Sequence, residues 1–241
     1  MLFSRAPRWD KIKKIKWDNC NGNIFKKLSL YNIDMDMKQF NNLKLSYNNL
    51  QIDLVGTDTN VPITCRRYSN YNIDVSNPNK FIFTDNKITL LKQNTIETKT
   101  FLPLDYRIID EDLKDLLTQI TAVTLYSSKF NKNIKTINMA IHQVRLITYP
   151  YLLDDIVDES FHSTEADTII PALIVNKHNI QNDKSVIYDK DNKILNTKLY
   201  EGEFIFQDNR YLSHYNTPIK TNSTNKYIGY RDIIGFDFIY S

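Results

Sequence analysis

Two histidines in this chain stand out by their surroundings, and both lie in its second half. The sequence contains four histidines, His142, His162, His178 and His214. A lone histidine is usually a core or surface side chain with a satisfied ring nitrogen, and His178 lies in the polar turn NKHNIQNDK, so we assign it no role. His162 in ESFHSTEADTIIP and His214 in RYLSHY each lie beside a strand-like segment. Imidazole binds metals and carries protons near neutral pH, so these two are the first candidates for chemistry.

The segments that would position these histidines are short and strand-like. Residues 64–100 contain RRYSNYNIDV, KFIFT and KITLLKQ, separated by Asn-Pro-Asn and Asp-Asn turns. From residue 134 onward the strand-like segments are INMAIHQVRLITY, DTIIPALIV, KSVIYD, GEFIFQD, RYLSHY and RDIIGFDFIY. Such a density of short strands is typical of a sandwich or barrel. In the last segment Arg231, Ile233 and Gly235 share one face, while Ile234 and Phe236 share the other, so both faces of that strand are expected to be partly buried.

Helices are expected mainly before these strands. The clearest pattern is 110–126, where leucines, Ile120 and Val123 recur at helical spacing behind an acidic first turn. Weaker patterns indicate helices near 8–17 and 35–45. No linker or repeat divides the chain. We therefore expect a single domain over 1–241, with a helical or irregular N-terminal cap over 1–60 and a β-sheet core over 61–241.

Composition excludes several classes of protein. The chain has 241 residues, 41% of them hydrophobic, 12% aromatic and 24% charged, which is typical of a globular protein with a sizeable core. A net charge of +3 with dispersed basic residues argues against a nucleic-acid partner. No apolar run approaches membrane-spanning length. Cys20 and Cys65 form neither a metal motif nor a disulfide framework, and we expect a cytoplasmic protein.

Five motifs in order resemble one family. They are CRRYSNY (65–71), HQVR (142–145), FHSTEADTIIPALIVNKHNIQNDKSVIYD (161–189), FQDNRYLSHYNTPI (206–219) and YRDIIGFDFIY (230–240). Together they resemble the iron(II)/2-oxoglutarate-dependent dioxygenases that hydroxylate free amino acids, a family that includes bacterial L-isoleucine 4-hydroxylase. The resemblance covers roughly residues 60–241 and implies a double-stranded β-helix, a jelly roll of the cupin kind, in agreement with the strand pattern.

The resemblance implies roles for particular residues. His162 and His214 match the metal-binding histidines, and Arg231 matches the arginine that anchors the distal carboxylate of 2-oxoglutarate, a role that suits the forked guanidinium. Fe(II) and 2-oxoglutarate are the implied cofactors, and a small molecule, such as a free amino acid, is the implied substrate. Arg67, Arg145 and Gln143 are candidates for binding that substrate, although a structural salt bridge is as good an explanation for each arginine alone. A homodimer is left open.

The sequence departs from the family at two places near this site. Thr164 stands where the family has the metal carboxylate, and Asn182-Asp183 stand where it usually has two glycines. Glu165 can supply the carboxylate if a bulge turns it toward the metal. Alternatively Asp167 loops back, a halide fills the vacancy as in related halogenases, or the site holds no metal.

Three functions are therefore compared. The first is an oxygenase that hydroxylates a free amino acid or similar small molecule with release of succinate and CO2. The second is a catalytically degenerate jelly roll that acts as a binding or regulatory module. The third is a carboxylate-less variant similar to a halogenase. Retention of both histidines and Arg231 favours the first.

Overall fold

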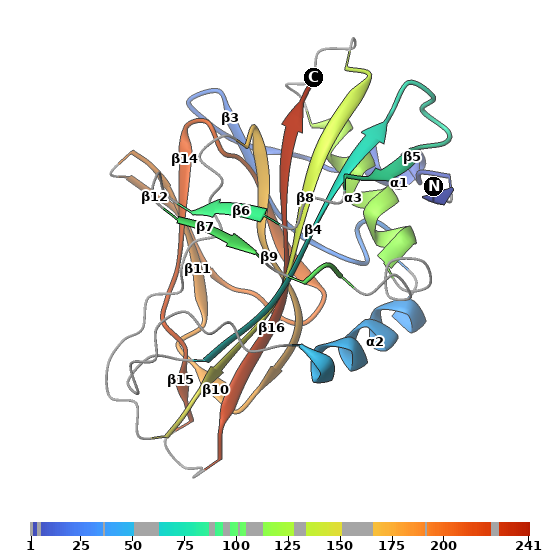
Figure 1. The fold of residues 1–241 in the computed structure, drawn as a ribbon. Coiled ribbons are helices and arrows are strands. Elements are labelled where there is room, and N and C mark those ends of the chain that lie inside the picture. The colour runs from blue at the N-terminus through green and yellow to red at the C-terminus, as the bar shows by residue number, and fades with distance from the viewer. Residues whose placement is uncertain are drawn as a thin grey trace.

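The protein is built around one large antiparallel sheet. The computed structural model describes residues 2–3, 6–35, 37–50, 63–86, 90–93, 97–100, 102–104, 113–127, 134–150, 166–190, 192–222 and 227–241. The large sheet has nine strands in the spatial order β1 (Leu2–Phe3), β5 (Ile82–Asp85), β4 (Ile63–Asp74), β8 (Thr136–Thr148), β16 (Gly229–Tyr240), β9 (Thr168–His178), β13 (Glu203–Asp208), β3 (Asn23–Ser29) and β2 (Asp18–Cys20). The twelve-residue strands β4 and β16 and the longer β8 form its centre (Figure 1).

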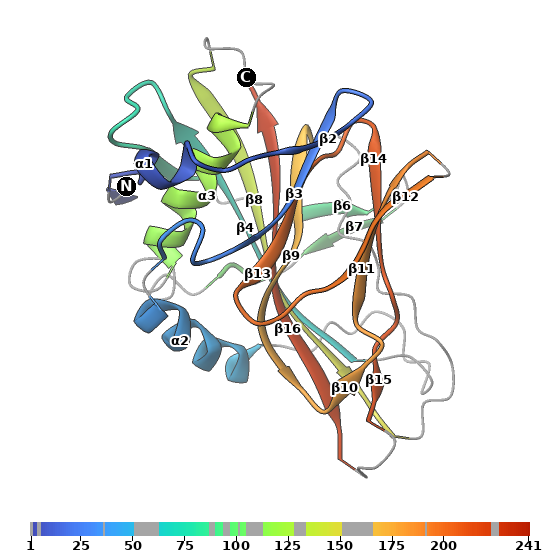
Figure 2. The same cartoon turned by 180° about the vertical axis from the view of Figure 1, so that it is seen from behind.

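A smaller sheet and a helical layer cover the two faces of the large sheet. The smaller sheet has the order β12 (Asn192–Lys198), β11 (Lys184–Asp189), β14 (Leu212–Asn216). The helical elements are α1 (Trp9–Ile12), α2 (Met37–Ser46), the 3-10 turn η1 (Tyr47–Asn49) and α3 (Lys114–Tyr126). Figures 1 and 2 show the helices on one side of the large sheet and β11, β12 and β14 on the other. Two short ribbons, β6 (Leu90–Gln93) with β7 (Glu97–Thr100) and β10 (Ile180–Gln181) with β15 (Lys220–Thr221), complete the described strands.

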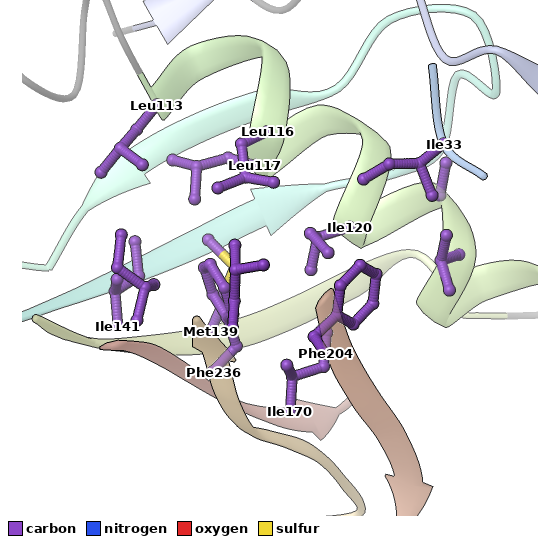
Figure 3. Close-up of a cluster of buried hydrophobic side chains, with 14 of the residues drawn as sticks. Ile33, Leu113, Leu116, Leu117, Ile120, Met139, Ile141, Ile170, Phe204 and Phe236 are labelled. Carbon is purple, nitrogen blue, oxygen red and sulfur yellow. The ribbon is translucent and has the colours of Figure 1, made fainter. Parts of the chain in front are cut away.

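Two hydrophobic clusters lie on either side of the large sheet. We call the face toward the helices the outer face and the face toward the smaller sheet the inner face. On the outer face, leucines and Ile120 of α3 pack on Met139, Ile141 and Phe236 (Figure 3). On the inner face, Val144 and Ile233 pack with side chains of the smaller sheet. The alternation of β16 explains this division, because neighbouring residues of a strand point to opposite faces.

The helix expected from the leucine spacing is confirmed over the described part of its range. α3 begins at Lys114 and ends at Tyr126, and its leucines face the sheet as expected. Its opposite side is also buried, because the N-terminal segment lies on it: the Arg8 guanidinium donates to Asp115 at 2.9 and 3.0 Å, and the Arg8 backbone N–H donates to Gln119 at 2.8 Å. This second contact surface is not visible in a helical periodicity.

The N-terminal residues contribute strands as well as helices, which differs from the expected cap over 1–60. The helix expected near 8–17 is only the single turn α1, whereas the helix near 35–45 is confirmed as α2. β2 and β3 form a hairpin through Asn21 and Gly22, with φ of 50° and 79°, the positive values that an Asn-Gly turn adopts. β3 then pairs with β13 and extends the large sheet. None of the helices in the described parts of the chain is both long and apolar enough to cross a membrane.

Candidate functional site

Arg231 and His214 face the same interior from opposite sheets. Arg231 is 2% exposed and lies on β16 two residues before Ile233, on the inner face. His214 is 7% exposed and lies opposite Ile187 of β11, in the middle of β14. Ile187 and Ile233 belong to one apolar cluster between the two sheets. The sequence-predicted metal ligand and the predicted 2-oxoglutarate anchor therefore both project into that space.

A second cation lies directly beside Arg231. Lys177 of β9 is the register partner of Arg231, and opposite residues of an antiparallel pair project from the same face. The Lys177 ammonium donates to the Asp183 carboxylate and to the Leu199 carbonyl, and Lys198 contacts the other oxygen of Asp183 at 3.3 Å. Burial lowers the pKa of Lys177, the contact with Asp183 raises it, and the charges of Arg231 and Lys198 lower it further.

These contacts account for both residues that replace the family's glycines. Asn182 has a φ of 61°, in the left-handed region where glycine is the default and asparagine is tolerated. Asp183 is 3% exposed and holds Lys177 and Lys198 through its two carboxylate oxygens. The first replacement therefore keeps the turn, and the second adds a buried carboxylate that binds Lys177, the register partner of Arg231.

The remaining predicted metal residues lie outside the described part of the chain. They are His162 and Glu165, and Thr164, which replaces the family's carboxylate, lies between them. Asp167, the other carboxylate considered, accepts a hydrogen bond from the backbone of Tyr240 at 2.9 Å. No group of three or more histidine, cysteine or acidic side chains with metal-binding geometry occurs among the residues for which positions are given. His214 is thus the predicted metal ligand whose surroundings the structure describes.

Arg67, Gln143 and Arg145 lie together, but on the outer face of the large sheet. Arg67 is the register partner of Gln143, and Arg145 follows on the same side of β8. Gln143 donates to Ser46 Oγ of α2 at 2.6 Å, and Arg67 donates to the Asn49 carbonyl at 3.3 Å. Arg231 projects from the opposite face of the same sheet. This placement does not support the substrate-binding role predicted for the three residues.

Arg145 instead forms an ion pair with a buried carboxylate. Its Nε and Nη2 donate to the two carboxylate oxygens of Asp232 at 2.6 and 2.9 Å. The guanidinium lies 4.6 Å from the ring centre of Tyr230, close enough for a cation–π contact. Burial raises the pKa of the Asp232 carboxyl, and Arg145 only partly offsets that rise, while the hydrogen bond to Asp232 raises the pKa of Arg145. The geometry is that of a structural pair.

A polar group on the inner face was not predicted from sequence. His142 Nε2 and Asp237 Oδ2 are 3.1 Å apart, and the Tyr68 ring meets the His142 ring edge-on at 5.1 Å. Arg66, 5% exposed, lies on β4 two residues before Tyr68 and thus on the same face. The i, i+2 spacing of Arg66 and Tyr68 indicates that the two side chains share a face of the strand. The choice between Arg66 and Arg67 needs the register of β4 against β8, which one sequence does not contain.

The chain resembles several solved structures, among them one of a dioxygenase. It superposes on IDO from Bacillus thuringiensis with a TM-score of 0.70 and 17% identity, covering 90% of this chain and 94% of that one. The superposition on a bsmA homologue from Methylobium petroleophilum has a TM-score of 0.71 and 14% identity, and it covers 89% of this chain and 87% of that one. The superposition on the Fe(II)/α-ketoglutarate-dependent dioxygenase TqaL has a TM-score of 0.60 and 12% identity, and it covers 89% of this chain and 82% of that one. At these identities the likeness concerns the fold, and it confirms the expected mainly β jelly roll.

Sequence comparison identifies the family. No curated protein sequence matches the chain. The family model of the 2OG-Fe dioxygenases matches residues 44–237, which include β4, β8 and the whole of the smaller sheet. The chain therefore belongs to the 2OG-Fe dioxygenase family, whose cofactors are Fe(II) and 2-oxoglutarate.

Proposed function

We propose that this member of the family hydroxylates a free amino acid or a similar small molecule in the space between the two sheets. The observation that carries the proposal is the placement of His214 and Arg231, buried on facing sheets around one apolar cluster. An imidazole is a suitable ligand for Fe(II), and a guanidinium pairs bidentately with a carboxylate. The side chains on the inner face therefore fit the two cofactors of the family.

The chain's own residues have separate tasks in this mechanism. His214 would hold the iron together with His162, and Glu165 is our candidate for the carboxylate ligand. Arg231 would bind the distal carboxylate of 2-oxoglutarate and so orient the cosubstrate. When bound, the cofactors supply the oxidation chemistry, with 2-oxoglutarate converted to succinate and CO2. The apolar cluster around Ile187 and Ile233 excludes water from that space.

Binding of the cosubstrate tests this proposal directly. We would titrate the anaerobic protein with Fe(II) and 2-oxoglutarate and follow the visible absorption band of the chelate. A saturable band is expected in the wild-type protein and should disappear in His214→Ala and Arg231→Met. Arg67→Met is the matched control, because it removes a guanidinium from the outer face of the same sheet. Absence of a band in the wild-type protein, with no iron retained, would refute the oxygenase function and favour a binding module.

The third metal ligand is tested with two neighbouring variants. If Glu165 binds the metal, Glu165→Gln should weaken Fe(II) binding far more than Thr164→Ala. Fe(II) affinity measured by equilibrium dialysis reports this without turnover. Unchanged affinity in Glu165→Gln would remove Glu165 from the site, and chloride-dependent affinity in that case would favour the halide alternative.

Arg66 is our candidate for the substrate carboxylate. It is the arginine of CRRYSNY on the inner face, where Tyr68, His142 and Asp237 also lie. An amino acid presents a carboxylate and an ammonium, and the inner face offers groups of both charges. Succinate release should be measured against a panel of free amino acids. Arg66→Met should abolish the stimulation by the preferred amino acid and leave the band with 2-oxoglutarate, whereas Arg67→Met should keep both.

A further inference from the structure

Lys177 and Arg231 form a pair of like charges on adjacent strands. They are direct register partners of β9 and β16, and like charges directly opposite each other destabilise a sheet. Both are sheltered: Arg231 is 2% exposed, and the Lys177 side chain is 14% exposed. Sheltered charges are costly unless they are paired, and Lys177 and Lys198 share the single carboxylate of Asp183. An arrangement of this kind is suited to an anion that both cations can reach.

Contacts around Lys177 fix its ammonium and leave a donor for such an anion. An ammonium group has three N–H donors. The contacts of Lys177 occupy two of them, one with Asp183 and one with the Leu199 carbonyl. Asp183 is itself buried at 3% exposure and is shared with Lys198. The lysine is therefore held by two contacts, and Arg231 is its register partner on the neighbouring strand.

We propose that Lys177 is a second cation for the distal carboxylate of 2-oxoglutarate, positioned by Asp183, so that the pocket selects a dicarboxylate over 2-oxo acids without that group. The inference rests on the proposed function, in which Arg231 binds the same carboxylate. It adds a specificity-determining residue on β9 and gives the replacement of glycine by Asp183 a purpose. Burial is the main cause of the lowered pKa of Lys177, and the charges of Arg231 and Lys198 lower it further.

The test compares two ligands that differ in the distal carboxylate. Anaerobic titrations of the Fe(II)-loaded protein with 2-oxoglutarate and with 2-oxobutyrate give two dissociation constants. Lys177→Met should weaken 2-oxoglutarate binding by about 10- to 100-fold, the value of one hydrogen bond to a charged group. Binding of 2-oxobutyrate should change by less than about threefold, because that ligand does not reach the lysine. Lys177→Arg should restore much of the discrimination.

Lys198 provides the matched control. It contacts the same Asp183 carboxylate, but 47% of its side chain is exposed, so Lys198→Met should change either constant by less than about threefold. Lys177→Met leaves the Asp183 carboxylate with one partner fewer, so the single variant can fail to fold. In that case the two dissociation constants are measured in the double variant Lys177→Met/Asp183→Asn, which removes both charges.

The outcomes separate this inference from the proposed function. Suppose that the wild-type protein binds 2-oxoglutarate and that Arg231→Met does not. If the Lys177 variants then keep the wild-type ratio of the dissociation constants for 2-oxoglutarate and 2-oxobutyrate, the inference is overturned and the proposed function stands. Equal weakening of both ligands would also overturn it, since that result indicates a structural role. If the wild-type protein binds neither ligand, both fail.

Discussion

Replacing Arg145 by methionine tests on which face of the large sheet the ligands bind. The substitution keeps an unbranched apolar side chain and removes the cation that is paired with Asp232 through two hydrogen bonds. The Asp232 side chain is fully buried, so its carboxylate would remain in the outer-face layer without its charged partner. Because Arg145 projects away from Arg231, we expect a loss of stability and no loss of 2-oxoglutarate binding.

The expected loss follows from the burial of the pair. Removing one partner of a buried ion pair costs about 3–5 kcal/mol, and for a chain of this length that corresponds to a fall in Tm of about 6–20 °C. The double variant Arg145→Met/Asp232→Asn should recover part of this loss, since no unpaired charge stays buried. Thermal unfolding followed by circular dichroism measures both values, and the titration with Fe(II) and 2-oxoglutarate supplies the second readout.

The pH dependence of the same variant gives an independent check. Burial already raises the pKa of Asp232 in the folded protein, and removing Arg145 raises it further above the value in the unfolded chain. The folded state then binds a proton more readily, so stability falls as pH rises through the folded-state pKa. The loss of unfolding free energy in Arg145→Met, relative to the wild type, should therefore be smaller at pH 4 than at pH 8. A variant as stable as the wild type that loses ligand binding would refute this placement of Arg145.

Three further predictions concern other parts of the molecule. Gly229→Ala should lower Tm, since a Cβ there would lie 2.6 Å from the Asn179 carbonyl oxygen and overpacking costs about 1–3 kcal/mol; an unchanged Tm would contradict this close approach. Phe236→Ala should cost about 3–5 kcal/mol in denaturant unfolding, because the side chain is fully buried on the outer face, while the band with 2-oxoglutarate should persist at low denaturant. The affinity for 2-oxoglutarate should fall as pH rises through the lowered pKa of Lys177, since the ammonium loses its charge. Isothermal titration should show no such fall in Lys177→Arg. An equal fall in the wild-type protein and in Lys177→Arg would exclude Lys177 as the cause.

Local patterns predicted much of the fold. The leucine spacing of α3 and the alternation of β16 each encode burial within a single element, and both are confirmed. The β2–β3 hairpin was missed although the Asn21-Gly22 turn signal is present in the sequence. Its partner β13 lies far along the chain, and no local pattern specifies such pairing.

The candidate site was predicted less completely because it depends on register. His214 and Arg231 were expected in one site and do face one interior. Arg67 and Arg145 were placed with them because their residue types suit a carboxylate, yet strand pairing directs both to the helical layer. Lys177 and Asp183 were not recognised as neighbours of Arg231, since their proximity arises from the β9–β16 register and from the fold of the turn at Asn182.

The position of β16 has a consequence for how the protein is made. This strand lies between β8 and β9, and pairs with both. It is therefore the described strand that joins one half of the large sheet, β1, β5, β4 and β8, to the other half, β9, β13, β3 and β2. Synthesis proceeds at about 5–20 residues per second. The half that contains β8 therefore waits for several seconds, and the half that contains β9 and β13 for a shorter time, before residues 229–240 are made. During that interval the edges of β8 and β9 that later pair with β16 are exposed to neighbouring chains. Binding of a chaperone to the nascent chain should therefore be strongest just before β16 emerges.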